Sequence, residues 1–297
     1  MKQECWAELI DVRKRFGTVT ALNGVDLQVR SGELLALLGQ NGAGKTTAIS
    51  LLLGLQQPDS GTALLFGRSP LELETRREIG VMMQEAALVP ELRVREQIEL
   101  VASYYPDAMT PALAMQMTHT EALADRPYGK LSGGQKRQVQ FALAVCGRPK
   151  LLFLDEPTVG LDIQSRELMW CTLRNLVREG ASIVLTTHYL EEAEALADRV
   201  AVLAKGRVIA SGTIQEMRSL VVRKQISCSS SLSVEQIRTW KDVQSVRRDH
   251  KGLEITARNA EAIVRRLFEE DEDLQDLEVQ RAGLAQIFTA LTQESAE

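Results

Sequence analysis

The stretch Gly39–Thr47 has the sequence Gly-Gln-Asn-Gly-Ala-Gly-Lys-Thr-Thr, which fits the pattern G-x-x-x-x-G-K-[ST]. Its glycines allow backbone torsions closed to other residues, so successive N–H groups can surround an anion. Lys45 supplies a positive charge for the terminal phosphates of a nucleotide, and the Thr46 hydroxyl can bind Mg²⁺. The alternative is an accidental glycine-rich turn, expected in roughly one in a hundred chains of this length. We therefore predict a triphosphate site formed by Gly39, Gln40, Asn41, Gly42, Ala43, Gly44, Lys45, Thr46 and Thr47.

The segments on either side of this loop agree with that prediction. Leu34–Leu38 is an apolar run short enough for a buried strand, and Thr47–Leu55 is apolar at helical spacing. A strand, a glycine loop and a helix N-terminus together form a phosphate site, and the helix dipole adds to the attraction. We expect an α/β fold.

Length and composition limit the class of protein. The 297 residues correspond to roughly two domains, and 44% apolar with 25% charged residues argues against a disordered or fibrous chain. A net charge of −5 argues against a nucleic-acid partner. No apolar run approaches the roughly 18 residues of a membrane span, and Glu4, Glu8 and Asp11 interrupt any signal peptide. We expect a cytoplasmic protein without direct membrane insertion, in which these scattered cysteines are reduced: Cys5, Cys146, Cys171 and Cys228.

The N-terminal part is expected to form a β-rich edge. Residues 7–29 have the pattern of short strands broken by turns, with apolar residues alternating against polar ones. Phe16 lies beside Gly17 in an expected turn, where an aromatic ring is unusual. Two interpretations of Phe16 are open: buried packing, or a flat ring on which a base stacks.

Residues 85–130 have a different pattern. Apolar residues recur at helical spacing, prolines separate the segments and strand patterns stop, which predicts a small helical insertion. The insertion ends at Leu131–Gln135, Leu-Ser-Gly-Gly-Gln, and an apolar helical face follows from Arg137 to Cys146.

Two acidic residues follow a strand that is apolar on both faces. Leu151–Leu154 is typical of a central parallel strand, and Asp155 and Glu156 lie at its carboxyl end, where open α/β sheets bind ligands. Asp155 can hold Mg²⁺, and Glu156 can polarise a water for attack on the γ-phosphate. A solvated acidic pair is the alternative.

A histidine is expected at the same edge of the sheet. The candidate strand Ile183–Leu185 ends in Thr186-Thr187-His188, which places His188 near Asp155, although an isolated histidine is more often structural. A hairpin at Lys205–Gly206 follows, and the main domain is expected to close near Gly212.

In this order and spacing, the motifs resemble those of the ATP-binding subunit of an ABC transporter, over about Ala7–Ser219. The resemblance implies a P-loop NTPase fold with a β-rich edge, a RecA-like parallel-sheet core and a helical insertion, the helical subdomain spanning about 85–147. It also implies ATP hydrolysis with Glu156, His188 and Lys45 as catalytic residues, Phe16 stacked on adenine, and Mg²⁺ held by Thr46, Gln84 and Asp155. Gln138 departs from the family, in which many members carry Arg.

The resemblance further implies a shared site. In the family, two cassettes pack head to tail, so a homodimer is expected in which one copy contacts the ATP bound by the other through Ser132, Gly133, Gly134, Gln135 and Asp162. ATP then holds the dimer together, and hydrolysis releases it.

The segments Gly160–Arg166 and Leu185–Gly212 look most like the branch that pairs with exporters of drugs, lipids and polysaccharides. The insertion, with Gln84 at its entrance, is then expected to bind a helix of an integral-membrane permease. This contact would hold the protein at the cytoplasmic face of the inner membrane. The alternative is a soluble ABC ATPase acting on nucleic acid or ribosomes, although such members usually carry two cassettes or a long coiled coil. A kinase or GTPase with the same glycine loop does not explain Leu131–Gln135.

A second domain is expected at 220–297, after a first domain at 1–219. Strands and helices alternate in the order β-α-β-β-α-β between residues 222 and 279, with a turn at 249–252 and a final helix at 284–291, which is ferredoxin-like in outline. A regulatory or dimer-stabilising module and an inert extension are both open interpretations. His119 and His250 have no companions for a metal site.

Overall fold

The computed structural model describes residues 4–84, 86–220, 224–249 and 252–281, together with Leu284 and Phe288. The chain divides into two compact units, Met1–Thr213 and Ile214–Glu297. This division lies ahead of the boundary expected after Ser219, because helix α8 (Ile214–Leu220) belongs to the second unit. Within the described ranges, no helix has both the length and the apolar character needed to cross a membrane.

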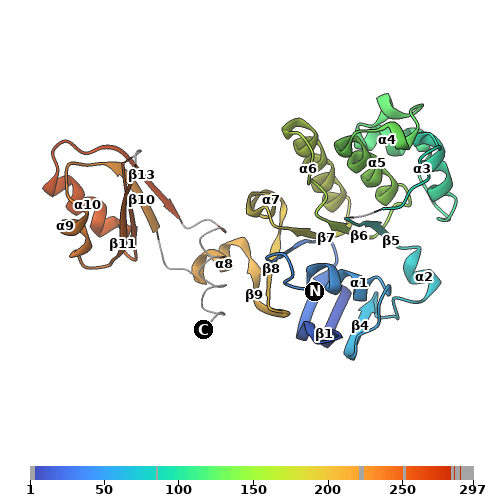
Figure 1. The fold of residues 1–297 in the computed structure, drawn as a ribbon, viewed down its shortest axis with the longest axis horizontal. Coiled ribbons are helices and arrows are strands. Elements are labelled where there is room, and N and C mark those ends of the chain that lie inside the picture. The colour runs from blue at the N-terminus through green and yellow to red at the C-terminus, as the bar shows by residue number, and fades with distance from the viewer. Residues whose placement is uncertain are drawn as a thin grey trace. The chain divides into compact units, whose positions relative to one another are not determined.

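A six-stranded sheet forms the centre of the first unit (Figure 1). Five neighbouring strands, β5, β6, β7, β3 and β8, are parallel to one another. Strand β9 pairs antiparallel with β8 at one edge. Strands β3, β6 and β7 are buried at every position, as predicted for strands covered on both faces. In spatial order the strands are β5 (Ile79–Met82), β6 (Leu151–Asp155), β7 (Ser182–Thr187), β3 (Leu34–Leu38), β8 (Arg199–Ala204) and β9 (Arg207–Thr213).

The predicted β-rich edge is a second, antiparallel sheet in the order β2-β1-β4. Its strands are longer than expected, because the interruptions in the pattern are bulges that bend a strand without ending it. One such bulge lies at Asp11, which has a φ of 43° where the pairing register shifts. The strands are β1 (Cys5–Phe16), β2 (Val19–Arg30) and β4 (Ser60–Leu65).

Two hydrophobic cores lie on the two faces of the parallel sheet. On one face, helix α1 (Lys45–Leu52) lies between the two sheets (Figure 1), and Leu35, Leu37 and Phe153 pack with it. On the other face, α5 (Gly133–Val145), α6 (Ile163–Arg178) and α7 (Leu190–Leu196) cover the sheet. The alternation of Leu34 and Leu35 between these cores follows from the period of two in a strand.

The helical insertion has a core of its own and packs on α5. It contains α3 (Val94–Ala102), α4 (Pro111–Thr118) and short 3-10 turns at Glu121–Leu123 and Tyr128–Lys130. His119 ends α4 in a left-handed conformation with a φ of 55°. A short helix before the insertion, α2 (Leu73–Arg76), is too brief for its pattern to be recognised in the sequence. The predicted cassette fold is confirmed.

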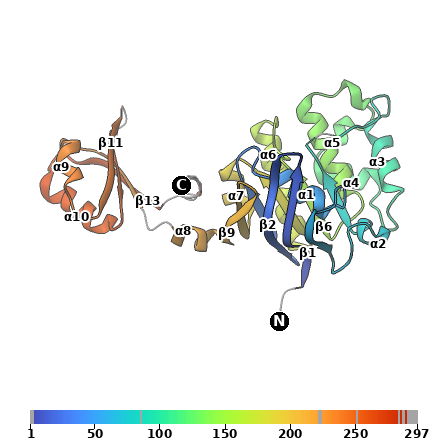
Figure 2. The ribbon, with the colours of Figure 1, turned by 60° about the horizontal axis from the view of Figure 1, so that its bottom comes forward.

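The second unit has the predicted ferredoxin-like topology, with helices α9 and α10 on the same side of a four-stranded antiparallel sheet (Figure 2). Its order is β11-β12-β10-β13, and Ile226, Ile255 and Leu267 lie in its core. Residues 222–223, His250 and most of the predicted helix 284–291 lie outside the described residues. The elements are β10 (Lys224–Ser229), α9 (Val234–Arg238), β11 (Val243–Asp249), β12 (Gly252–Ala257), α10 (Ala260–Glu270) and β13 (Gln275–Arg281).

Candidate functional site

Residues from several separated motifs line one pocket of about 460 Å³ in the first unit. The glycine loop joins β3 to α1, and residues from the ends of β5 and β6 and from the start of β2 lie against it. The structure therefore brings Gln84 and Glu156 together with the glycine loop. The lining residues are Val19, Ala21, Asn41, Gly42, Gly44, Lys45, Thr46, Thr47, Gln84 and Glu156.

The loop needs its glycines for two different reasons. Gly42 and Gly44 have φ values of 81° and 109°, a region that side chains disfavour. A Cβ on Gly44 would lie 2.6 Å from the carbonyl oxygen of Ala21, and one on Gly39 would lie 2.6 Å from that of Leu203. The loop can therefore approach its neighbours closely, and it leads directly into the N-terminus of α1 at Lys45.

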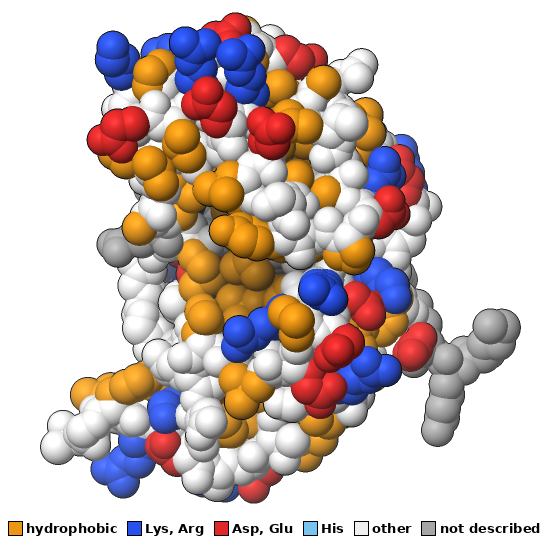
Figure 3. All heavy atoms as spheres, turned by 90° about the vertical axis from the view of Figure 1, so that its right-hand side faces the viewer, with side chains coloured by type: hydrophobic (Ala, Val, Ile, Leu, Met, Phe, Trp, Pro, Cys, Tyr) orange, Lys and Arg blue, Asp and Glu red, His pale blue; other side chains and the backbone are white. Residues whose placement is uncertain are grey.

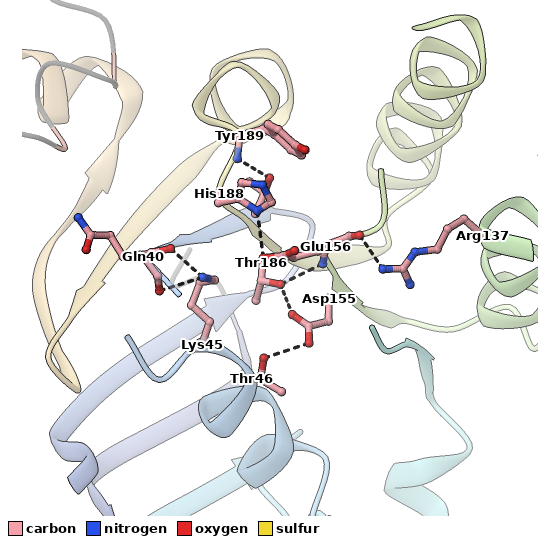
Figure 4. A network of polar contacts seen from close by, with 11 residues as sticks. Gln40, Lys45, Thr46, Arg137, Asp155, Glu156, Thr186, His188 and Tyr189 are labelled. Carbon is pink, nitrogen blue, oxygen red and sulfur yellow. Dashed lines mark hydrogen bonds and ion pairs between the residues drawn. The ribbon is translucent and has the colours of Figure 1, made fainter. Parts of the chain in front are cut away.

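Lys45 is a buried cation within the loop. Its side chain is 6% exposed, and Nζ donates to the carbonyl oxygens of Gly39 at 2.7 Å and Gln40 at 3.2 Å (Figure 4). Burial lowers the pKa of Lys45, an effect that the negative charges of Glu156 and Asp155 oppose. The ammonium group thus lies where a phosphate in the pocket would meet it.

Asp155 connects the tip of β6 to the first helix. The Thr46 hydroxyl donates to Asp155 Oδ2 at 3.2 Å, and the Thr186 hydroxyl donates to the other carboxylate oxygen of Asp155 (Figure 4). Asp155 is 2% exposed. A hydroxyl and a carboxylate are oxygen ligands of the type that Mg²⁺ prefers, so this donor set fits that ion.

Glu156 is held at its backbone and at its carboxylate. Its φ of 50° is left-handed, and its N–H donates to both the carbonyl oxygen and the hydroxyl of Thr186, each at 3.1 Å. Its Oε1 accepts from His188 Nδ1 at 3.1 Å (Figure 4). His188 therefore contacts Glu156 from the end of the neighbouring strand instead of packing in a core.

Arg137 and Thr186 belong to this network, and sequence reasoning missed both. Arg137, in α5, is 8% exposed and donates to the carbonyl oxygens of Glu156 at 3.1 Å and Met83 at 3.0 Å. Burial lowers the pKa of Arg137, and the charges of Asp155 and Glu156 oppose this effect.

The sequence does contain a pattern that indicates a buried arginine. Arg137 shares one helical face with Phe141, Ala144 and Val145, all of them in the core under α5. A charge on such a face needs partners inside the protein.

Phe16 lies at the end of β1 and does not line the pocket. Its ring is 46% exposed, with Lys14 Nζ 5.7 Å from the ring centroid. The interpretation as a buried packing residue is therefore wrong, because nearly half of the side chain is open to solvent.

The residues expected to act on a second copy's nucleotide lie together, but none of them lines the pocket. Ser132 caps α5, accepting from the Gln135 N–H at 3.3 Å, while Gln135 Oε1 accepts from the Ser132 N–H at 3.1 Å. Asp162 caps α6, accepting from the Ser165 N–H at 2.8 Å. The two loops touch, since a Cβ on Gly134 would lie 3.0 Å from the Gly160 carbonyl oxygen.

Gln138, the departure from the expected pattern, joins the same two helices. Its Nε2 donates to Ser165 Oγ at 3.1 Å, so it links α5 to the first turn of α6. It does not line the pocket.

Comparison with known proteins points to one family. The family described as "ABC transporter" matches residues 22–159. A relative from Burkholderia lata, named Nod factor export ATP-binding protein I, is 41% identical over 225 residues, covering 73% of each chain. A protein of the same name from Rhizobium sp. (strain N33) is 42% identical over 217 residues, covering 69% of this chain and 70% of its own.

Solved structures agree with the sequence comparison. The ATP-binding subunit of an ABC transporter superposes with a TM-score of 0.67 at 28% identity, covering 72% of this chain and 92% of its own. A dimeric post-hydrolysis state of an ATP-binding cassette bound to ADP and Pi superposes with a TM-score of 0.64 at 27% identity. It covers 70% of this chain and 98% of its own.

Proposed function

The chain belongs to the ABC transporter family as an ATP-hydrolysing subunit, and we propose that it drives export through a separate membrane subunit. The proposed substrate is a drug-like, lipid or polysaccharide molecule. The family supports ATP-driven transport, and the name of the relatives, which specifies Nod factor export, supports export as the direction for the present chain.

ATP is proposed to bind with its phosphates in the glycine loop. The Lys45 ammonium would exchange its loop carbonyls for the β- and γ-phosphates, and the N–H groups at the start of α1 would face the same anion. The exposed ring of Phe16 would take the adenine, because a solvent-accessible aromatic face is available for stacking without repacking a core.

Thr46, Asp155 and Gln84 are the residues that would hold Mg²⁺. The 3.2 Å contact between Thr46 and Asp155 supports a shared site, and Gln84 lines the same pocket. When bound, the ion would neutralise charge on the β- and γ-phosphates.

Glu156 is proposed as the base that polarises the attacking water. The observation that supports hydrolysis most directly is that Glu156 lines the same pocket as Lys45 and Thr46. His188 would orient this carboxylate and contact the γ-phosphate, since its side chain is 41% exposed at the same edge.

Two copies are proposed to close head to tail around ATP. In that arrangement Ser132, Gly133, Gly134 and Gln135 of one copy would present the N-terminus of α5 to the γ-phosphate bound by the other, with Asp162 beside them. The position of these residues outside their own chain's pocket supports a role in trans. Closure would couple to ATP only if the closed dimer binds ATP more tightly than the open one.

The membrane subunit is proposed to bind in a hollow beside the helical insertion. Figure 3 views the first unit from the side on which α2 and α3 lie in Figure 1, and hydrophobic side chains gather in a hollow in the middle of that face. Large apolar side chains are exposed on or next to α2 and α3 and in the segment between these helices, which supports an apolar partner on this side; they are Leu71, Leu73, Val89, Leu100 and Tyr104. Binding at this surface would place the chain at the cytoplasmic face of the membrane.

Reconstitution tests this function. The chain should co-purify with a membrane protein and, in vesicles that contain that protein, drive ATP-dependent movement of a lipid or polysaccharide substrate. Co-purification of ribosomes or DNA without any membrane protein would contradict export and favour the soluble ABC ATPase.

A further inference from the structure

We propose that Arg137 is a positioning residue for ATP hydrolysis, whose guanidinium fixes the backbones of Glu156 and Met83 to helix α5. The inference rests on the proposed function, in which Glu156 activates water and Gln84, directly after Met83, binds in the same pocket. It assigns Arg137 no contact with ATP, because Arg137 does not line that pocket.

The contacts come from a single buried side chain. Nη2 of Arg137 donates to the Glu156 carbonyl oxygen at 3.1 Å, and Nη1 donates to the Met83 carbonyl oxygen at 3.0 Å. Because Arg137 is only 8% exposed, water competes little for these hydrogen bonds, and the charge depends on these protein oxygens for its solvation.

The bond to Glu156 supports a strained residue. A left-handed φ at a residue other than glycine persists only where the surroundings determine it, and Glu156 has a φ of 50°. Thr186 holds its N–H and Arg137 holds its carbonyl oxygen, so both polar groups of this backbone unit are fixed. The direction of the Glu156 carboxylate into the pocket depends on this backbone.

The bond to Met83 joins a second strand end to the same helix. Met83 follows β5 and Glu156 follows β6, which is the neighbouring strand, and Arg137 lies one turn into α5. The helix begins next to Ser132, at the loop proposed to meet the nucleotide of the second copy. A displacement of α5 would therefore move Gln84 and Glu156 together, which links the loop that acts in trans to the residues that act in cis.

An arginine suits this arrangement better than a lysine. Its planar group reaches two carbonyl oxygens in different directions, and Gln140 Oε1 accepts a further bond from Nη1 at 3.2 Å. Gln140 is oriented in turn, because its Nε2 donates to the Tyr128 hydroxyl at 3.0 Å. A lysine carries all three of its N–H donors on one nitrogen, so it can satisfy only part of a set of acceptors that two separate guanidinium nitrogens contact.

The test measures steady-state hydrolysis, ATP affinity and thermal unfolding for the purified full chain and three variants. Arg137→Gln should lower kcat about 10- to 100-fold while the Kd for ATP stays within about twofold of the wild type. Arg137→Lys should have a higher kcat than Arg137→Gln. If Arg137 had only a structural role, such a gain in kcat would occur only together with a gain in thermal stability. Arg174→Gln, on the exposed surface of α6, is the matched control and should hydrolyse ATP at the wild-type rate.

A folded Arg137→Gln variant with a kcat within about twofold of the wild type would overturn the inference. If Arg137→Gln does not fold, the Gln140→Leu variant tests the inference instead, because it removes an acceptor of the guanidinium and leaves the arginine in place. A kcat lowered about threefold or more at unchanged ATP affinity supports the inference, and an unchanged kcat overturns it. Wild-type hydrolysis without export in reconstituted vesicles would contradict the proposed function alone.

Discussion

His188 Nδ1 lies 3.1 Å from Glu156 Oε1, although 32 positions separate the two residues in the chain. The contact exists because β6 and β7 are adjacent and parallel, so the residues that follow them meet at one edge of the sheet. A carboxylate only accepts hydrogen bonds, which places the imidazole proton on Nδ1 and leaves Nε2 as the atom available to another partner.

Replacing Glu156 should separate ATP binding from hydrolysis. Glu156→Gln keeps the size of the side chain but removes the proposed base, so kcat should fall below about 1% of the wild-type value while ATP affinity is retained. The variant should also accumulate as an ATP-bound dimer in size-exclusion chromatography. Glu167→Gln, at an exposed position of α6, is the control. Hydrolysis by Glu156→Gln near the wild-type rate would show that another group is the base.

Replacing Lys45 should act on binding itself. Lys45→Ala removes the buried ammonium that faces the pocket, so the Kd for ATP should rise at least about tenfold, equivalent to a loss of about 1.4 kcal/mol. Isothermal titration with ATP measures this. Lys150→Ala, which removes an exposed lysine paired with Glu78, should leave the affinity unchanged. An undiminished affinity for Lys45→Ala would contradict the assignment of the phosphate loop.

Phe16 offers a test of adenine stacking. Because its ring is 46% exposed, Phe16→Ala should cost little stability, yet it should weaken ATP binding by about 1–3 kcal/mol if a base stacks there. Phe16→Tyr should bind ATP as the wild type does. The comparison of ATP with inorganic triphosphate in the same titrations identifies the base as the group involved, since only ATP binding should respond.

Thr186 should matter through its hydroxyl. Thr186→Val keeps the volume of a fully buried side chain but removes the contacts to the Asp155 carboxylate and the Glu156 N–H, so kcat should fall about tenfold. Thr172→Val removes a similarly buried hydroxyl from α6 and is the matched control for stability. If both variants lose stability equally and neither loses kcat, Thr186 has no role in positioning.

The parts of the fold that could be predicted from the sequence are those set by local pattern. Gly39–Thr47 could be recognised as a phosphate loop from its pattern alone, and the positive φ of Gly42 and Gly44 is a local demand that glycine meets. The close approach of Gly39 to the Leu203 carbonyl oxygen depends on a strand distant in sequence. Strands such as Leu34–Leu38 are short apolar runs, so burial on both faces follows from composition. The bulge at Asp11 could not be predicted, since it depends on the pairing between β1 and β2.

The parts of the site that escaped prediction depend on partners distant in sequence. Arg137 meets Glu156 across 19 positions and Met83 across 54, and both partners are backbone oxygens, which no residue pattern marks. Thr186 differs from Arg137, because the sequence places its hydroxyl two positions before His188, which was itself a predicted site residue. Its link to Asp155 required the pairing of β6 with β7.

A buried carboxylate behind the site predicts how stability depends on pH. Glu192, in α7, is 1% exposed, and its Oε1 accepts from Trp170 Nε1 at 3.1 Å. Burial raises the pKa of Glu192, and hydrogen bonds from Thr187 and Trp170 offset this only in part. The folded protein therefore holds the proton at a higher pH than the unfolded chain does, so the contribution of Glu192 to stability falls as the pH rises from about 4.5 through the raised pKa.

Glu192→Gln should remove this dependence. Glutamine keeps an oxygen that accepts from Trp170 and carries no charge at any pH, so the variant should gain thermal stability relative to the wild type as the pH rises from 5 to 8. Thermal unfolding of both proteins across that range measures the difference. Glu191→Gln, at the exposed neighbouring position, should run parallel to the wild type. A difference between Glu192→Gln and the wild type that stays constant with pH would mean that Glu192 titrates alike in the folded and unfolded chains.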